Sequence, residues 1–291
     1  MPIVPHSWET PRFYYYLCRH YGGGMEFIMK ENKLRNLLKN GSPSTSTRLW
    51  STWPFYTEVV GSIGNFDYVE FVAEYSPFTD YDLENLARAA ELHGMGTMLK
   101  ADFQNRGFVA QKAVAAGFQA ILFADHHTPD EVRESIRLMK PDRLGQGRYG
   151  YPNRRFIGTQ SHLSQMDHCR RLDEIVLCFM IEKQDAMENI EEICSIPSVD
   201  MVQFGPSDYS MSAGKNREEY INEFKVAERK MIEVALRHGV APRCEIPNSE
   251  AAQYYIDLGV RHFSLGDQLA TLKQFWIEDG GKIRGIANSL E

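Results

Sequence analysis

This sequence of 291 residues lacks the features that mark several common classes of protein. No apolar run approaches the roughly 18 residues of a membrane span, and the first residues lack the basic start and apolar stretch of a signal peptide. The five cysteines are odd in number and form no CxxC pair, so we expect reduced thiols in a cytoplasmic protein rather than a disulfide framework. The net charge of −7 leaves no basic excess, which argues against a nucleic acid or an acidic membrane as a partner.

The apolar content, 43%, is sufficient for one large domain or two small ones. Residues 1–30 differ from the remainder, because they are rich in aromatic residues and contain Gly22, Gly23 and Gly24 in succession. Regular hydrophobic spacing begins only near Glu31. We therefore predict a loosely attached amino-terminal extension over residues 1–30 and one folded domain over residues 31–291 that ends in a helix.

Short apolar or β-rich runs alternate with amphipathic helical segments from residue 31 onward. Strands that alternate with helices indicate parallel βα units, and eight such units in this length predict a closed (β/α)8 barrel, the TIM barrel. The rival is an open doubly wound sheet, which usually carries a glycine-rich phosphate turn after its first strand, and none is present. The eight predicted strands span residues 45–50, 67–75, 96–101, 119–124, 174–182, 200–205, 241–246 and 261–266.

The longest connection between predicted elements runs over residues 140–173 and is rich in Arg, His and Asn. Loops of this length in a compact domain are usually functional or disordered. We predict that it follows the fourth strand on the carboxyl-terminal side of the barrel, where active sites lie. This connection contains His162 and His168. They are weak candidates for a site role, and we expect them to be ordinary solvated residues.

Two carboxylates stand at the ends of neighbouring predicted strands. Glu182 closes the apolar run VLCFMIE, and Asp208 follows the next run in FGPSDYS. Each has an ordinary alternative role, since Glu182 could be solvated and Asp208 could cap a helix. Together, on the carboxyl-terminal face of a barrel, they are the hard oxygen ligands that suit Mg²⁺ or Mn²⁺.

The segments FMIEK (179–183), FGPSDYS (204–210) and LGVRHFSLGDQ (258–268) resemble those of the HpcH/HpaI family of class II aldolases, and the resemblance covers about residues 31–275. It implies that Glu182 and Asp208 bind a divalent metal, Mg²⁺ or Mn²⁺ with Co²⁺ as an alternative. It also implies a 2-oxo acid substrate whose enolate the metal stabilises as a Lewis acid. Backbone amides of the turn Gly205, Pro206 and Ser207 are expected to help hold the substrate carboxylate.

The chain departs from the family pattern at the residues that handle protons. After the second strand, the family's Asp-x-Glu-His reads Val72-Ala73-Glu74-Tyr75, so Glu74 is kept and Tyr75 replaces the histidine. Lys100 replaces the family's arginine after the third strand. We predict a catalytic role for Lys100 as a cation and for Tyr75 as a proton donor, with Glu74 contacting the substrate.

Other residues at the predicted strand ends are candidates for the missing roles. His126 and His127 end the fourth strand, and we predict that one of them projects into the rim cavity of Glu182 and supplies proton transfer. The alternative is that both are solvated loop residues. Glu245, at the end of the seventh strand, is predicted to bind a polar part of the substrate. Trp50 is predicted to pack in the core, with stacking on the substrate as the alternative.

These observations predict a metal-dependent carbon–carbon lyase that acts on a 2-oxo acid or related carboxylate by aldol cleavage or decarboxylation. One alternative makes Lys100 a Schiff-base nucleophile, and another is a catalytically silent barrel with a binding or regulatory role. The family assembles through its carboxyl-terminal helices, and the last segment of this chain places apolar residues at helical spacing, so we expect a homo-oligomer. These residues are Leu269, Leu272, Phe275 and Trp276.

Overall fold

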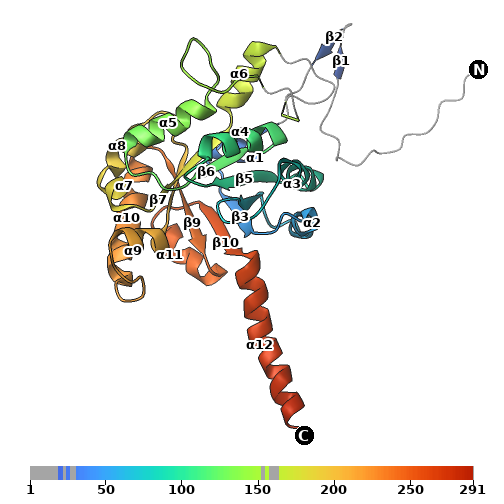
Figure 1. Ribbon diagram of the computed structural model, residues 1–291, viewed down its shortest axis with the longest axis vertical. Helices are drawn as coiled ribbons and strands as arrows, with labels where there is room; N and C mark the ends of the chain where they lie inside the picture. The colour runs from blue at the N-terminus through green and yellow to red at the C-terminus, as the bar shows by residue number, and fades with distance from the viewer. Residues whose placement is uncertain (1–18, 22–23, 27–30, 152–154, 157–163, 291) are drawn as a thin grey trace, which may run out of the picture.

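The computed structural model describes residues 19–21, 24–26, 31–151, 155–156 and 164–290. Eight parallel strands close into a barrel in the order β10-β3-β4-β5-β6-β7-β8-β9, with helices around them (Figure 1). This confirms the predicted (β/α)8 fold. The barrel strands are β3 (Ser44–Leu49), β4 (Tyr68–Val72), β5 (Gly96–Ala101), β6 (Ala120–Phe123), β7 (Val176–Ile181), β8 (Met201–Phe204), β9 (Ala241–Ile246) and β10 (His262–Asp267).

Each barrel strand overlaps a predicted one. The second prediction, 67–75, was too long, because β4 stops at Val72 and the next residues form a turn that carries Glu74 and Tyr75. In the amino-terminal extension, β1 (Arg19–Tyr21) and β2 (Gly24–Glu26) pair as a short antiparallel hairpin that the sequence did not predict.

The helices follow the strands with short connections. They are α1 (Lys33–Lys39), α2 (Pro54–Ile63), α3 (Asp80–Leu92), α4 (Arg106–Ala116), α5 (Pro129–Met139), α6 (Gln165–Asp173), α7 (Gln184–Glu188), α8 (Ile190–Ser195), α9 (Pro206–Ser212), α10 (Ile221–Arg237), α11 (Ala252–Asp257) and α12 (Gln268–Asn288). Among the described residues, none of these helices combines the length and apolar character that a bilayer crossing requires.

Local sequence signals explain where several helices begin. The Thr79 side chain accepts a hydrogen bond from the backbone amide of Asp82, and Asp82 accepts one from the amide of Thr79, which is a capping box at the start of α3. Thr128 and Glu131 form the same arrangement at the start of α5. Both caps lie soon after the carboxyl ends of β4 and β6, so they fix the path of the chain next to the active-site face.

The barrel interior is polar on one side. Arg243 on β9 reaches across the lumen to Glu70 on β4, with 2.6 Å between the guanidinium and the carboxylate, and neither side chain is exposed. Arg243 also donates to the Tyr68 hydroxyl at 2.8 Å, to Ser46 Oγ at 3.0 Å and to Gln203 Oε1. Because a buried charge is costly unless it is paired and hydrogen-bonded, this network ties β3, β4, β8 and β9 together beneath the rim.

The other side of the interior is apolar. It is lined by Met98, Leu122, Cys178 and Met180, and Leu34 of α1 packs with them. A larger apolar layer lies between the strands and the surrounding helices. The closed interior therefore positions the residues that follow each strand without leaving a pore.

The long connection over residues 140–173 does not lie where the sequence predicted. Strand β6 ends at Phe123 and is followed by α5, so residues 140–151 come after a helix, and α6 then leads into β7. The connection therefore belongs to the amino-terminal end of the barrel. His168 on α6 is buried there and its Nε2 contacts the carbonyl of Gly150 at 3.1 Å, whereas His162 lies outside the described residues.

Candidate active site

Glu182 lies at the carboxyl end of β7 with only 1% of its surface exposed. Its Oε1 accepts a hydrogen bond of 2.8 Å from the backbone amide of Asp125, which follows β6. Its Oε2 is buried and has no hydrogen-bond partner among the described residues. A Cβ at Gly205 would come within 2.6 Å of this oxygen, so the absence of a side chain at Gly205 permits the close approach.

Asp208 lies in the first turn of α9, directly after β8, and its charge acts on Glu182. Burial raises the pKa of Glu182 to about 7 against the opposing effects of Lys100 and the Asp125 amide, and the carboxylate of Asp208 raises it further. The two acids therefore share one rim and repel each other. A buried carboxylate oxygen without a donor, next to a second carboxylate, fits a divalent cation with hard oxygen ligands. That the carboxylates of Glu182 and Asp208 lie within about 6 Å of each other stays a prediction.

Lys100, at the end of β5, faces the same acids. Its ammonium group lies 2.5 Å from a carboxylate oxygen of Glu74, and both side chains are largely buried. Burial alone would lower the pKa of Lys100, but the carboxylates of Glu182 and Glu74 outweigh it and raise the pKa above its ordinary value. The neighbouring acids therefore favour the charged form of Lys100 at this rim. A Schiff-base lysine needs a depressed pKa, so this environment argues against the Schiff-base alternative.

Tyr75 stands beside this ion pair. The Lys100 ammonium lies 5.5 Å from the centre of its ring, and the ring stacks on Trp50 with centroids 6.2 Å apart. Burial and the nearby carboxylate of Glu74 raise the pKa of Tyr75, and the charge of Asp208 adds to the rise. The phenol is therefore neutral at neutral pH and can act as a hydrogen-bond or proton donor.

We predicted that His126 or His127 projects into the rim cavity beside Glu182, and the structure gives the His126 ring other partners. This ring packs edge-on against Phe123 and Phe179 on the outer side of the barrel wall. There Nε2 contacts Ser135 Oγ at 2.8 Å and Arg106 at 3.1 Å. Burial, together with the charge of Arg106, lowers the pKa of His126 to about 3, so its imidazole is uncharged at neutral pH. Alternation along β6 would point His126 inward with Leu122 and Ala124, but the left-handed conformation of Asp125 breaks that alternation and turns the His126 ring outward.

His127 is half-exposed and its Nδ1 lies 3.0 Å from Asp185 at the start of α7. Among the described residues, no hydrogen bond or ion pair joins it to Glu182 or Lys100. The residue of this segment that reaches Glu182 is instead Asp125, which no sequence pattern had indicated. It adopts a left-handed conformation with φ of 58°, which turns its amide toward Glu182, and its carboxylate pairs with Lys183 at 2.5 Å.

The predicted substrate contacts divide into two groups. In the turn before α9, the Gly205 amide already donates to the Ile181 carbonyl at 3.2 Å and Pro206 has no N–H, so of these three residues Ser207 retains an amide to offer. Glu245 is engaged by the protein itself. Its carboxylate pairs with Arg48 at 2.8 Å and accepts a hydrogen bond from Gln203 at 2.7 Å. Arg48 was another residue that sequence patterns had not indicated.

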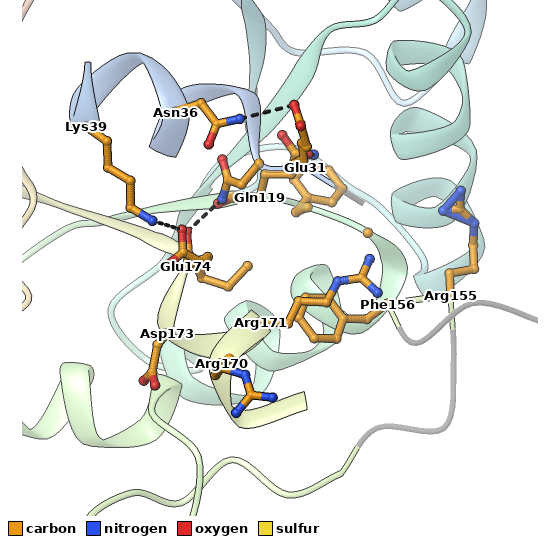
Figure 2. A pocket seen from close by; sticks show the side chains of 14 residues that line it. Glu31, Asn36, Lys39, Gln119, Arg155, Phe156, Arg170, Arg171, Asp173 and Glu174 are labelled. Atoms are coloured by element: carbon orange, nitrogen blue, oxygen red, sulfur yellow. Dashed lines mark hydrogen bonds and ion pairs between the residues drawn. The ribbon is translucent and has the colours of Figure 1, made fainter. Parts of the chain in front are cut away.

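A cavity of about 500 Å³ lies at the amino-terminal ends of β6 and β7, the opposite end of the barrel from Glu182. Figure 2 shows charged side chains around it, including Lys39 and Glu174, which pair with each other at 2.5 Å. Arg155, also at its wall, pairs with Glu91 at 2.7 Å. Because these groups neutralise one another and lie far from the carboxylate rim, we place the active site at the rim and not in this cavity.

Comparisons with known proteins identify the family and the fold. The sequence model of the HpcH/HpaI aldolase/citrate lyase family matches residues 78–270. The chain is 23% identical over 261 residues to a hydroxypyruvate/pyruvate aldolase of Delftia acidovorans, covering 87% of this chain and 93% of that protein. It is 23% identical over 244 residues to a 4-hydroxy-2-oxo-heptane-1,7-dioate aldolase of Escherichia coli, covering 81% and 88%. The fold matches the HpcH/HpaI aldolase of Desulfitobacterium hafniense with a TM-score of 0.79 at 20% identity, covering 87% of this chain and 97% of that one.

Proposed function

Because the chain belongs to the HpcH/HpaI aldolase/citrate lyase family, whose relatives include aldolases, we propose that it is a divalent-metal-dependent lyase acting on a 2-oxo acid. It is a carbon–carbon lyase by family, and the metal and substrate class are the proposed part. The observation that carries the proposal is the buried Glu182 Oε2, which has no partner among the described residues and lies on the same rim as Asp208. Two carboxylates with room for water and substrate oxygens suit Mg²⁺ or Mn²⁺.

The chain's own residues then have distinct tasks. An ion held by Glu182 and Asp208 would act as a Lewis acid toward the keto and carboxylate oxygens of the substrate. Asp125 fixes Glu182 through its backbone amide, and Glu74 holds Lys100 in place. Lys100 remains charged and can stabilise negative charge on the substrate oxygens. Tyr75 keeps its proton and stands beside Lys100, so it can donate to a developing anion.

This assignment leaves two reactions open, aldol cleavage and decarboxylation, because both generate the same enolate. The test is a screen of hydroxy-oxo acids and oxo diacids with Mg²⁺, Mn²⁺ or Co²⁺, followed as pyruvate release and CO2 release. We expect turnover that requires the metal and is lost in Asp208→Ala. Metal binding without turnover of any oxo acid would instead favour a silent binding barrel.

We also propose that the protein is a homo-oligomer assembled through α12, in the cytoplasm. Figure 1 shows α12 extending away from the barrel, and none of its 21 residues is buried. Phe275 and Trp276 are 60% and 64% exposed, and Ile277 beside them is 63% exposed. Exposed apolar surface of this kind usually marks a contact with another protein surface. A second copy of the chain would cover it.

A further inference from the structure

An aromatic pair borders the proposed reaction centre. Trp50 follows β3 and Tyr75 follows β4, so the two residues stand on neighbouring strands at the carboxyl-terminal rim. Their rings stack with an interplanar angle of 21°. Lys100 lies over the Tyr75 ring, and Asp208 is near enough to act on the Tyr75 phenol electrostatically. The Trp50–Tyr75 pair is therefore one wall of the site that contains Glu182 and Asp208, the proposed metal ligands.

This wall offers contacts that the protein itself does not use. Tyr75 is 60% exposed although it is aromatic and stands at the mouth of the barrel. The indole Nε1 of Trp50 is buried and has no acceptor among the described residues. A buried donor without an acceptor is unfavourable, and a bound molecule that places an oxygen beside it would remove this penalty. Trp50 and Lys100 contact only part of the Tyr75 ring, and its exposed part is apolar surface against which a flat group can pack.

The charges at the rim also favour an uncharged group at the far end of the substrate. Within the described part of the chain, each basic side chain at the carboxyl end of a barrel strand already faces an acid. Arg48 pairs with Glu245 at 2.8 Å, and Lys100 pairs with Glu74 at 2.5 Å. Lys183, just beyond β7, pairs with Asp125 at 2.5 Å.

Arg106, at the start of α4, directs its guanidinium toward His126 outside the barrel wall. Because Lys100 would face the oxo-acid end, a second carboxylate at the far end of a substrate would meet acids, or cations such as Arg48 that already face an acid. Burying such a carboxylate without a partner is costly.

We propose that the Trp50–Tyr75 pair determines specificity, and that the substrate is a 2-oxo acid whose far end is a flat, uncharged aromatic or unsaturated group rather than a carboxylate. This inference rests on the proposed oxo-acid function and adds the class of its substrate. It sets the chain apart from the Escherichia coli relative, whose name specifies a heptane-1,7-dioate. The oxo-acid end would face Glu182 and Asp208, and the far end would lie against Tyr75.

Binding of non-cleavable oxo acids tests this inference without requiring turnover. Three probes lack the hydroxyl needed for aldol cleavage: 2-oxo-4-phenylbutanoate, 2-oxoheptanoate and 2-oxoheptanedioate. The first two differ in the aromatic ring, and the last two differ in the second carboxylate. Titration calorimetry in saturating Mn²⁺ should give the tightest Kd for the phenyl compound, about tenfold below that of the dicarboxylate, with the aliphatic acid between them.

Variants separate stacking from charge. Tyr75→Ala should remove most of the difference between the phenyl and aliphatic acids, and Tyr75→Phe should keep it, because stacking needs the ring and not the hydroxyl. Trp50→Phe, which keeps a ring and loses the N–H, should weaken all three probes together. Tyr81→Ala, which removes another exposed tyrosine, on α3, is the matched control and should bind like the wild type.

The outcomes distinguish this inference from the proposed function. If the dicarboxylate binds as tightly as the phenyl acid, or if Tyr75→Ala leaves the ratio between the phenyl and aliphatic acids unchanged, the specificity proposal is overturned while the lyase assignment stands. If the predicted order of affinities is found but no hydroxy-oxo acid is cleaved and no oxo diacid is decarboxylated, the specificity holds and the lyase assignment fails. If none of the three probes binds, both fail.

Discussion

Replacing Glu182 by Gln should make the metal-free protein more stable. The carboxylate is buried, and its Oε2 has no donor in the described residues. Burial raises its pKa from the ordinary 4.5 to about 7. A carboxyl group whose pKa is higher in the folded state binds its proton more tightly there than in the unfolded chain. Its contribution to stability is therefore complete below about pH 4.5 and is lost as the pH rises to about 7.

The magnitude follows from the same two values. A pKa difference between 4.5 and about 7 corresponds to about 3 kcal/mol of free energy of unfolding that is lost above pH 7. Gln has the same shape and no charge, and its oxygen can still accept from the Asp125 amide. Its NH2 group needs a new acceptor, which offsets part of the gain. We expect Glu182→Gln to gain about 1–3 kcal/mol at pH 8 in a chelator and close to nothing at pH 5.

The assay is urea unfolding at pH 5 and pH 8, with a chelator or with excess Mn²⁺. An ion present at 100 times its Kd adds about 2.7 kcal/mol to a protein that binds it, so Mn²⁺ should stabilise the wild type at pH 8 and not Glu182→Gln. Glu233→Gln, an exposed acid on α10, is the control and should match the wild type, both in chelator at pH 8 and in its stabilisation by Mn²⁺. A chelated Glu182→Gln protein less stable than the wild type at pH 8, or equal stabilisation of both by Mn²⁺, would refute the reasoning.

Three further outcomes are expected. Lys100→Arg should retain measurable turnover, and Lys100→Ala should lose turnover by about 10²-fold or more, because Lys100 acts as a charge. Borohydride with substrate should trap no adduct, because Lys100 is not a nucleophile. His126→Ala should lower the free energy of unfolding in urea by about 1–3 kcal/mol, because it leaves the polar neighbours of His126 unpaired. His127→Ala should keep turnover within about threefold. A loss of turnover of about 10²-fold in His127→Ala would return His127 to the proton-transfer role. A Phe275→Glu, Trp276→Glu double variant should lower the mass measured by light scattering to that of one chain without lowering the melting temperature of the barrel, and an unchanged mass would contradict assembly through α12.

The amino-acid sequence was sufficient to predict the barrel. Alternation of apolar runs with amphipathic segments is set by local periodicity, so β3 through β10 overlap the predicted ranges. Placement of Glu182 at a strand end followed from the apolar run before it. Local patterns also located Asp208 on the same rim, because the carboxyl ends of parallel barrel strands meet there.

Tertiary structure decided which residues complete the site. Strand alternation continued past the end of β6 would place His126 inside the barrel, but the left-handed backbone of Asp125 turns that ring outward while the Asp125 amide meets Glu182. The raised pKa of Lys100 depends on acids from β4 and β7 that are distant in sequence.

The same holds for the Trp50–Tyr75 stack, whose members are joined only when β3 pairs with β4. Sequence periodicity reports which residues are apolar within one element. Contacts between elements depend on the closure of the barrel, which brings together side chains that no local pattern relates.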